Sequence, residues 1–264
     1  MKILIKLGGT LLDSQESRLR LAREIGEVAQ DEAGVVVVHG GGKQMTRFLA
    51  ERGIESQFIH GLRVTTPDVL DAVLKVLGGT VNKELVAAFI AAGANAVGLT
   101  GMDALLAEAE PMGPELGAVG KPIPSSGRLL ALLLEKGYLP VVACLAGDRQ
   151  GRFYNVNADQ MAVSVASSIQ AEKIFFLTDV DGVKGKDGAI LPEISLENCR
   201  TLIDSGTASG GMRAKLDAAA QAASSGVDEI FIAPGAAPHI ISRLLQGQSA
   251  GTRLLARRGA RSHA

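Results

Sequence analysis

The sequence predicts an α/β fold, a three-layer α/β/α sandwich around a central, mainly parallel sheet. Short apolar runs at residues 2–7, 35–38 and 173–177 are typical of strands buried on both faces. Segments with helical periodicity separate such runs along almost the whole chain. This alternation implies parallel strands with helices on both faces. Ligands of such sheets bind beyond the carboxyl ends of the strands, so a site is expected in the loops there.

The other elements follow from local patterns. A helix over residues 66–92 begins with Thr66 as N-cap and Pro67 in its first position, and Gly78-Gly79 is expected to loosen its middle. Residues 101–124 lack a sustained period and predict a β-hairpin excursion or a lid. Further strands are predicted at residues 95–100, 138–143 and 229–232, with 54–60 extended, 252–256 an edge strand and 257–264 a frayed tail. Further helices are predicted at residues 17–30, 43–52, 126–136, 158–170, 195–204, 212–223 and 238–245.

The composition argues against several classes of function. Lys and Arg total 27 against 28 Asp and Glu, so no general attraction to nucleic acid or to a membrane surface is expected. Aromatic residues make up only 3%, too few for the stacking surfaces of single-strand nucleic-acid binders. Cys144 and Cys199 form no CxxC motif and no Cys/His cluster, so neither a disulfide framework nor a structural zinc site is indicated. No signal-peptide pattern or membrane-length apolar run is present, and we expect a cytoplasmic protein.

The stretch from Val35 to Gly42 is the most informative one. A buried strand ends at three consecutive glycines, Gly40, Gly41 and Gly42, and a helix follows. Free NH groups and the positive end of the helix dipole then point at one spot, which is an arrangement that holds anions. The alternative is that the glycines only allow a tight turn. The two phosphate fingerprints GxxxxGK[ST] and GxGxxG are absent, so a P-loop or dinucleotide enzyme is disfavoured.

Four charged residues each have a structural and a functional interpretation. Lys6, at the end of an apolar strand beside Gly8-Gly9, either reaches solvent or meets an anion. Lys215 by itself reads as a solvated lysine. Asp159 stands at a predicted helix start, where a carboxylate commonly stabilises the helix. Arg63 is either a surface residue or a bidentate clamp for a carboxylate.

Together these segments resemble the amino-acid kinase family, over essentially residues 1–256. HGGG, GxRVT and NVNAD in this order are specific to one branch of it, whereas KxGG alone is loose. The segments that carry the resemblance are Lys6-Leu7-Gly8-Gly9, His39-Gly40-Gly41-Gly42, Gly61-Leu62-Arg63-Val64-Thr65, Asn155-Val156-Asn157-Ala158-Asp159-Gln160, Leu177-Thr178-Asp179-Val180-Asp181-Gly182-Val183 and Gly210-Gly211-Met212-Arg213-Ala214-Lys215.

The resemblance implies that ATP transfers its γ-phosphoryl group to the γ-carboxylate of N-acetyl-L-glutamate, the second step of arginine biosynthesis. A carboxylate is already ionised at pH 7, so no general base is needed. The protein's task is then to position the reactants and to neutralise charge on the phosphoryl group. Mg²⁺ is expected to arrive with ATP, held mainly by phosphates and water, and no metal ligand is assigned to the chain.

Residue roles also follow from the resemblance. Lys6 is expected to contact the transferring phosphoryl group and Lys215 the leaving side, while Asp159 organises both ammonium groups. The glycines Gly8, Gly9 and Gly41 are expected to supply NH groups around the phosphoryl group. The ATP site is expected to contain Lys6, Gly8 and Lys215 together with residues of two nucleotide-binding loops. The loop residues are Thr178, Asp179, Val180, Asp181, Gly182, Val183, Lys184, Thr207, Ala208 and Ser209.

The acceptor is expected to lie on the side of Lys6 that faces away from the nucleotide. The resemblance implies that Arg63 holds its α-carboxylate, that Asn155 meets its amide portion, and that the backbone of Gly41 and Gly42 contacts it. Residues 1–177 are thus expected to form an acceptor-binding and dimerisation lobe, and residues 178–256 an ATP-binding lobe, of one continuous domain.

Two departures bear on regulation and specificity. Lys43 stands where many relatives have Pro, which should change local charge without abolishing the turn. The 101–124 segment differs from the usual one, so the preferred acyl group is open. Because the sequence begins at its first strand, without the N-terminal helix of arginine-inhibited hexamers, we expect an arginine-insensitive homodimer.

The same residues leave three other functions to consider. A related kinase acting on N-succinylglutamate or a carrier-linked aminoadipate would share nearly all of these residues. Aspartokinase is less favoured, because its opening motif differs and no regulatory domain follows. A non-catalytic oxyanion- or nucleotide-binding relative is disfavoured by the joint presence of Lys6, Asp159 and Lys215.

Overall fold

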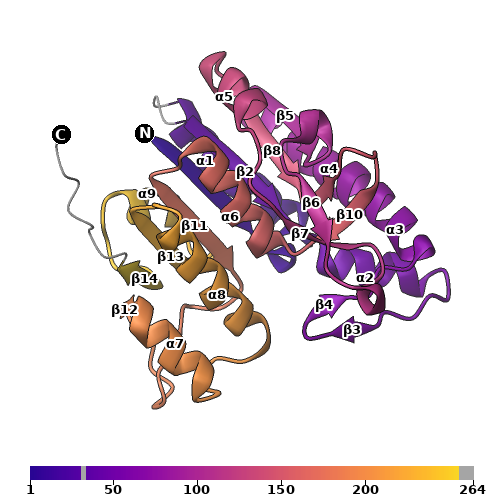
Figure 1. Cartoon of the computed structure of the whole chain (residues 1–264). Coiled ribbons are helices and arrows are strands. Elements are labelled where there is room, and N and C mark those ends of the chain that lie inside the picture. The colour runs from indigo at the N-terminus through magenta and orange to yellow at the C-terminus, as the bar shows by residue number, and fades with distance from the viewer. Residues whose placement is uncertain (31–33, 256–264) are drawn as a thin grey trace, which may run out of the picture.

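An eight-stranded sheet forms the centre of the molecule in the computed structural model, which describes residues 1–30 and 34–255 (Figure 1). Its strand order is β12-β14-β13-β11-β1-β2-β8-β5. All neighbours are parallel except β13 and β14. The predicted, mainly parallel sheet is therefore confirmed. The strands are β1 (Lys2–Leu7), β2 (Gly34–His39), β5 (Ala96–Thr100), β8 (Leu139–Ala143), β11 (Lys173–Thr178), β12 (Glu193–Ser195), β13 (Glu229–Pro234) and β14 (Thr252–Leu255).

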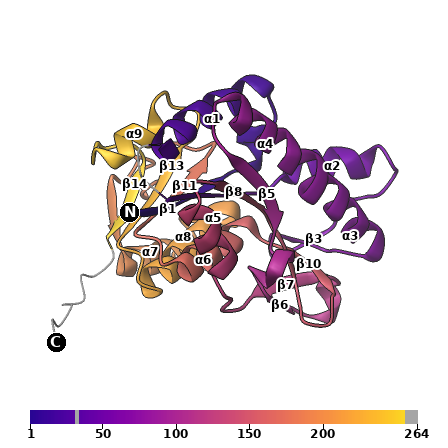
Figure 2. The same ribbon diagram turned by 90° about the horizontal axis from the view of Figure 1, so that it is seen from above.

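Helices cover both faces of this sheet, as the three-layer prediction requires (Figure 2). On one face lie α1 (Gln15–Gln30), α4 (Asn82–Ala91) and α9 (Ile240–Leu245). On the other face lie α5 (Arg128–Glu135), α6 (Ala158–Ile169) and α8 (Gly210–Ser224), with α7 (Leu196–Asp204) beside α8. The central strands β1, β2 and β11 are covered on both sides, which explains why they contain almost only apolar residues.

A second, four-stranded sheet stands beside the main one, in the order β6-β7-β10-β9. The antiparallel pair β6 (Ala109–Pro111) and β7 (Val119–Pro122) confirms the predicted hairpin excursion. Its partners β9 (Leu145–Gly147) and β10 (Phe153–Val156) were not predicted as strands. The motif Asn155-Val156-Asn157-Ala158-Asp159 therefore begins inside β10 of this small sheet, and Asp159 lies in the first turn of α6.

The predicted long helix over residues 66–92 is interrupted in its middle. It consists of α3 (Pro67–Val73), a π-helical segment η2 (Leu74–Val81) and α4. The predicted Thr66 cap is present, with its side chain accepting from the NH of Val69. The Gly78-Gly79 pair lies inside η2, so the expected loosening takes the form of a wider turn.

The prediction of an edge strand near the C-terminus is wrong. β14 pairs with β13 on one side and with the unpredicted β12 on the other, so β12 is the edge. β12 has only three residues, too few to show an alternating pattern. Residue 256 and the predicted frayed tail at 257–264 lie outside the described residues.

The connections near the sheet's carboxyl edge are short. A 3-10 turn η1 (Gly9–Leu12) follows β1, and α2 (Gly42–Ala50) follows β2. A small hairpin of β3 (Phe58–Ile59) and β4 (Leu62–Arg63) occupies the segment predicted to be extended. Two further 3-10 turns are η3 (Asp103–Leu105) and η4 (Pro114–Leu116).

Candidate functional site

A buried cluster of three charges lies at the carboxyl edge of the main sheet. The ammonium nitrogen of Lys6, at the end of β1, is 2.8 Å from Oδ1 of Asp159 in the first turn of α6. Lys215 in α8 places its ammonium nitrogen 3.5 Å from Oδ2 of the same carboxylate. Both Lys6 and Asp159 are only 5% exposed. The three residues, far apart in sequence, are therefore brought together as predicted, with one negative charge facing two positive ones.

The cluster places two ammonium groups against one carboxylate. Burial tends to raise the pKa of Asp159, but the charges and hydrogen bonds of Lys6 and Lys215 outweigh it and leave the pKa below its ordinary value. Burial lowers the pKa of Lys215, and the nearby Lys6 lowers it too, while Asp159 opposes both. A site with two ammonium groups and one carboxylate attracts an anion.

Two glycine turns meet next to this cluster. α2 begins at Gly42 with Gly41 as its N-cap, and no side chain caps it, so the NH groups of its first turn have no partner within the helix. A Cβ on Gly9 would lie 3.0 Å from the nitrogen of Gly42, and one on Gly41 would lie 2.5 Å from Cδ2 of Leu77. A side chain at Gly9 would therefore press on the backbone of the second turn, and one at Gly41 would require the Leu77 side chain to move.

One predicted NH donor is already used. The NH of Gly8 donates a 2.9 Å hydrogen bond to the carbonyl oxygen of Leu177, which continues the pairing of β1 with β11. The prediction that this NH group surrounds the phosphoryl group is wrong, because a parallel ladder extends one residue past the strand. Gly8 still lines the larger of the two cavities described next.

A cavity of about 220 Å³ lies on one side of Lys6. Gly41, Gly42, Arg63 and Asn155, the residues predicted to bind the acceptor, all line it. The guanidinium of Arg63 donates to Thr46 Oγ1 at 2.9 Å and to the Gly42 carbonyl at 3.2 Å, and it also bonds Ser56. These bonds hold a cation at the cavity wall beside the glycine turn.

A second cavity, of about 640 Å³, lies on the other side of Lys6. It is lined by four cationic side chains besides Arg63, namely Lys6, Lys43, Arg47 and Lys215, and by Thr178 and Asp179. Burial tends to raise the pKa of Asp179, but hydrogen bonds from its own backbone NH, Thr10 and Thr178 lower it. Lys6, Gly9, Gly42, Phe58 and Arg63 line both cavities, so the two meet at the cluster.

Several residues predicted for the nucleotide loops do not line these cavities. They are Val180, Asp181, Gly182, Val183, Lys184, Thr207, Ala208 and Ser209. Val183 and Ala208 are buried in the core at 1% and 4% exposure, and the NH of Val183 donates to Thr252 Oγ1 at 2.8 Å. The side chains of Val183 and Ala208 therefore anchor their loops.

Other residues in or beside the two cavities were not predicted. Thr65 accepts a 3.0 Å hydrogen bond from the amide of Asn155 and donates to the Arg63 carbonyl, so it links two predicted acceptor residues. Phe58 lies under the Arg63 guanidinium, with the ring centre 4.7 Å away. Cys144 lines the smaller cavity, and burial raises the pKa of its thiol to about 11. Because Thr65 belongs to the GxRVT motif, its place in the site could have been predicted from the sequence. No local sequence pattern marks Phe58 or Cys144 as site residues.

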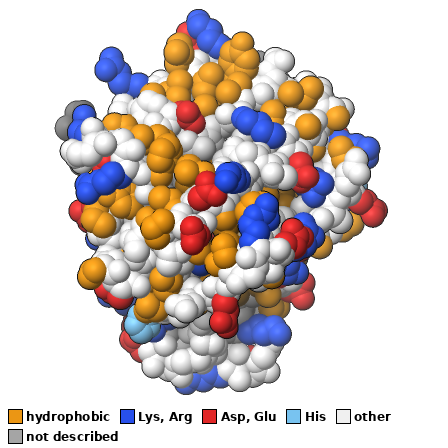
Figure 3. Space-filling view, turned by 90° about the vertical axis from the view of Figure 1, so that its right-hand side faces the viewer, with side chains coloured by type: hydrophobic (Ala, Val, Ile, Leu, Met, Phe, Trp, Pro, Cys, Tyr) orange, Lys and Arg blue, Asp and Glu red, His pale blue; other side chains and the backbone are white. Residues whose placement is uncertain are grey.

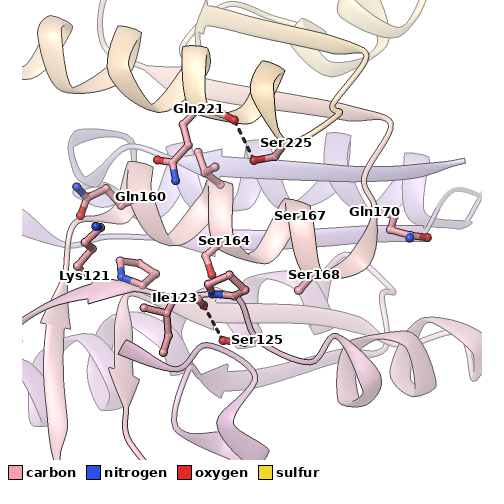
Figure 4. Close-up of a pocket in the computed structure, with 13 residues that line it drawn as sticks. Lys121, Ile123, Ser125, Gln160, Ser164, Ser167, Ser168, Gln170, Gln221 and Ser225 are labelled. Carbon is pink, nitrogen blue, oxygen red and sulfur yellow. Dashed lines mark hydrogen bonds between the residues drawn. The ribbon is translucent and has the colours of Figure 1, made fainter. Parts of the chain in front are cut away.

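A third cavity, of about 330 Å³, lies between α6, α8 and the segment after β7 (Figure 4). Gln160, next to Asp159 on α6, lines it, but none of the three charged residues of the cluster does. The hydroxyls of Ser125, Ser168 and Ser225 donate to backbone carbonyls of their own segments. Among the described residues that line this cavity, only Lys121 is charged. The cavity therefore lacks the several cationic side chains that suit the other two to an anion.

Residues 1–30 and 34–255 contain neither a metal-binding cluster nor a membrane-spanning helix. Within these residues, no group of three or more His, Cys, Asp or Glu side chains is placed to hold a metal ion. No helix there is long and apolar enough to cross a membrane.

Comparisons with known proteins agree with this geometry. A family model described as "Amino acid kinase family" matches residues 1–234. The chain is 56% identical over 255 residues to the acetylglutamate kinase of Solibacter usitatus, covering 97% of this chain and 99% of the relative. It is 40% identical over 259 residues to the acetylglutamate kinase of Acidobacterium capsulatum, covering 97% and 100%.

Solved structures share the fold. The smu.665 protein of Streptococcus mutans UA159 superposes with a TM-score of 0.84 at 27% identity, covering 97% of this chain and 98% of that one. An N-acetylglutamate synthase from Neisseria gonorrhoeae, in complex with coenzyme A and N-acetyl-glutamate, gives a TM-score of 0.84 at 27% identity. That match covers 96% of this chain but 59% of the synthase.

Proposed function

This chain belongs to the amino acid kinase family, and we propose that it transfers the γ-phosphoryl group of ATP to the γ-carboxylate of N-acetyl-L-glutamate. The products are N-acetyl-L-glutamyl 5-phosphate and ADP, as in arginine biosynthesis. The observation that carries this proposal is the position of the Lys6–Asp159–Lys215 cluster, where two cavities with different linings meet. One cavity then holds the acceptor and the other the nucleotide.

The residues of the cluster supply charge at the point of transfer. Lys6 lines both cavities and faces the phosphoryl group in flight, while Lys215 lines only the larger one and faces the leaving side. Asp159 holds both ammonium groups in place and remains ionised. Electrostatic stabilisation by prepositioned groups is the main contribution that a protein makes to phosphoryl transfer. The acceptor carboxylate is ionised at neutral pH, so these residues need not remove a proton.

Arg63 and Asn155 orient the acceptor. The guanidinium of Arg63 receives the α-carboxylate in the smaller cavity, and Asn155 meets the amide portion from the opposite strand β10. The NH groups of Gly9 and Gly41 face the phosphoryl group, and the backbone of Gly42 meets the acceptor. Hydrogen bonds from Arg63 to Thr46 and from Asn155 to Thr65 reduce the freedom of both side chains before substrate arrives.

The larger cavity fits a nucleoside triphosphate. Its cationic lining and the first turn of α2 suit phosphate oxygens, and Thr178 and Asp179 begin the loop after β11. Mg²⁺ enters as part of the substrate, with phosphates and water as its main ligands. The remaining loop residues, from Val180 to Lys184 and from Thr207 to Ser209, act on the nucleotide through loop position, since none of them lines the cavity.

Two organisational features belong to the same proposal. Residues 1–177 form the acceptor-binding lobe and residues 178–256 the nucleotide-binding lobe; in support, every lining residue of the smaller cavity precedes residue 177.

The protein is a homodimer that joins through the β5 edge. Each residue of β5 is partly exposed, and Ile90 on α4 and Leu132 on α5 are more than half exposed. Figure 3 shows hydrophobic patches between charged side chains on the molecule's side nearest this edge.

A hydroxamate assay tests the function. Hydroxylamine traps the acyl phosphate, so the purified protein with ATP, Mg²⁺ and N-acetyl-L-glutamate is expected to form a hydroxamate. N-Acetyl-L-aspartate, which has the same charge, and N-succinyl-L-glutamate, which carries one further carboxylate, serve as comparison acceptors. Faster turnover of N-succinylglutamate, or no turnover of any acceptor, would contradict the proposal. A monomer mass in gel filtration would contradict the dimer alone.

A further inference from the structure

Two buried polar side chains lie behind the glycine turn that follows β2. Nδ1 of His39 is 3.0 Å from the carbonyl oxygen of Gly40, and Nε2 is 3.0 Å from Nδ2 of Asn82. The same Asn82 nitrogen is 2.9 Å from the carbonyl oxygen of Val141 in β8. His39 is fully buried and Asn82 is 1% exposed, and neither lines a cavity described above.

These contacts fix the position of the imidazole proton. The Val141 carbonyl only accepts, so the Asn82 nitrogen must face it and donate. Its second hydrogen faces Nε2 of His39, which lies 3.0 Å from this nitrogen and is closer than the Leu99 carbonyl oxygen at 3.5 Å, so Nε2 carries a lone pair. The proton is then on Nδ1, where it donates to the Gly40 carbonyl. Burial lowers the pKa of His39 to about 4, although the Gly40 carbonyl opposes this, so the ring is neutral at pH 7.

The hydrogen bond to Gly40 sets the direction of the next NH group. No cis peptide bond occurs in the described residues, and in a trans peptide the C=O and N–H groups point in opposite directions. The Gly40 carbonyl faces the buried ring, so the Gly41 NH points away from it, on the side where Gly40, Gly41 and Gly42 line the smaller cavity with Lys6. Among residues 1–30 and 34–255, no acceptor is bonded to this NH.

The π-helical segment η2 places both parts of this arrangement. Leu77 of η2 packs where a side chain of Gly41 would be, and Asn82 follows directly after η2. A π turn adds one residue relative to an α turn, which rotates every later side chain by about 100° around the helix axis. This rotation sets which residue of α4 faces His39, and the sequence places an amide there.

We propose that His39 and Asn82 are positioning residues, which hold the Gly40–Gly41 peptide so that the Gly41 NH donates to the transferring phosphoryl group. The inference rests on the proposed function. If this peptide flipped, a carbonyl oxygen would replace the NH and would repel the phosphoryl oxygens. A donor aimed in advance at developing charge costs no reorganisation during the reaction.

Two substitutions at one position separate the roles of the two ring nitrogens. In His39→Asn, the amide nitrogen takes the place of Nδ1 and can still donate to the Gly40 carbonyl. In His39→Gln, the amide oxygen reaches the place of Nε2 and can still accept from Asn82, whereas the bond to Gly40 is lost. Each variant leaves one buried polar group unpaired, so both share a similar loss of stability.

We expect His39→Gln to lower kcat for acyl phosphate formation about 10- to 100-fold, with both KM values within about 3-fold of wild type. His39→Asn should keep kcat within about 3-fold. Equal losses of kcat in the two variants, or no loss in His39→Gln, would overturn the proposal, since a purely structural role does not distinguish the nitrogens. Thermal unfolding and ADP binding check that each variant is folded.

A second measurement needs neither a variant nor a substrate. In the ¹⁵N-labelled wild-type protein, long-range ¹H–¹⁵N correlations are expected to show His39 as the neutral Nδ1–H tautomer from pH 6 to 8. An Nε2–H tautomer, or a protonated ring in this range, would overturn the proposal even if His39→Gln does not fold. A wild-type protein inactive on N-acetyl-L-glutamate that shows the expected tautomer would instead contradict the proposed function.

Discussion

The two cavities that meet at Lys6 are built in different ways. The smaller one, of about 220 Å³, has apolar walls such as Met45 and Leu77, and its polar side chains Arg63 and Asn155 are held by hydrogen bonds to Thr46 and Thr65. The larger one, of about 640 Å³, is wider and carries most of the cationic side chains. From this difference we expect the smaller cavity to select its ligand by shape and fixed donors, and the larger one to bind by charge. Substitutions in each should therefore change different kinetic constants.

The largest effect is expected at the junction. Lys6→Ala or Lys215→Ala should lower kcat by about 10²- to 10³-fold while the acceptor KM changes far less, because both ammonium groups act chiefly in the transition state. Initial rates with both substrates varied measure this. Lys121→Ala, a lysine beside the third cavity, is the control and should behave as wild type. Wild-type turnover in Lys6→Ala or Lys215→Ala would remove the basis of the mechanism.

The next effect concerns the smaller cavity. Arg63→Ala should raise KM for N-acetyl-L-glutamate by about 10- to 100-fold, the value of a lost charge-assisted hydrogen bond pair, with less change in KM for ATP. Arg63→Lys keeps the charge but not the planar fork, and should recover only part of the loss. Because Arg63 lines both cavities, an equal rise of both KM values would show that the division between them is wrong.

A smaller effect is expected on the pH dependence of stability. The pKa of His39 is lowered by burial to about 4 from 6.5, so the unfolded chain binds more protons between these values and stability falls as the pH falls through this window. From pH 7 to pH 5 this group should remove about 2 kcal/mol of unfolding free energy. Denaturant unfolding of wild type and His39→Asn at both pH values measures it, with the exposed His60→Asn as control. If His39→Asn loses as much unfolding free energy between pH 7 and pH 5 as wild type does, the pH dependence arises from other groups.

The smallest effect is expected at the rim of the larger cavity. Lys43 lies 3.3 Å from Asp13 in an exposed ion pair, and such pairs are screened by water and salt. Lys43→Ala should raise KM for ATP only about 2-fold at low salt, and less at 0.5 M salt, without changing the acceptor KM. Rate measurements at two salt concentrations test this. A large, salt-independent loss would place Lys43 among the residues that act directly on the phosphates.

Much of the site was predictable because its signals are local. Lys6 ends an apolar strand beside two glycines, and Gly40-Gly41-Gly42 ends another, so the position of both turns follows from the sequence. The role of Asp159 needed the family resemblance, since an acidic residue at a helix start is common for stability alone. The assignment of Gly8 as a donor failed because hydrogen bonding between β1 and β11 runs one residue further than the apolar pattern.

Other features carried no local signal. The three-residue strand β12 is too short for a pattern, and the place of β14 between β13 and β12 depends on pairing between distant segments. Asn82 lies in a segment that reads as plain helix, and its contact with His39 exists only because η2 widens the turn before it. The roles of Phe58 and Cys144 likewise depend on which cavity their segments reach.

The amino-acid sequence by itself determined the strand–helix alternation, the glycine turns and the identity of the charged residues, because backbone preferences and burial periodicity act over a few neighbouring residues. The tertiary structure alone decided which of these meet. It brought the ammonium groups of Lys6 and Lys215 to the carboxylate of Asp159, and it gave the two cavities several lining residues in common. It also set a buried histidine and asparagine behind the turn. Such contacts depend on packing between segments far apart in the chain, which no local pattern records.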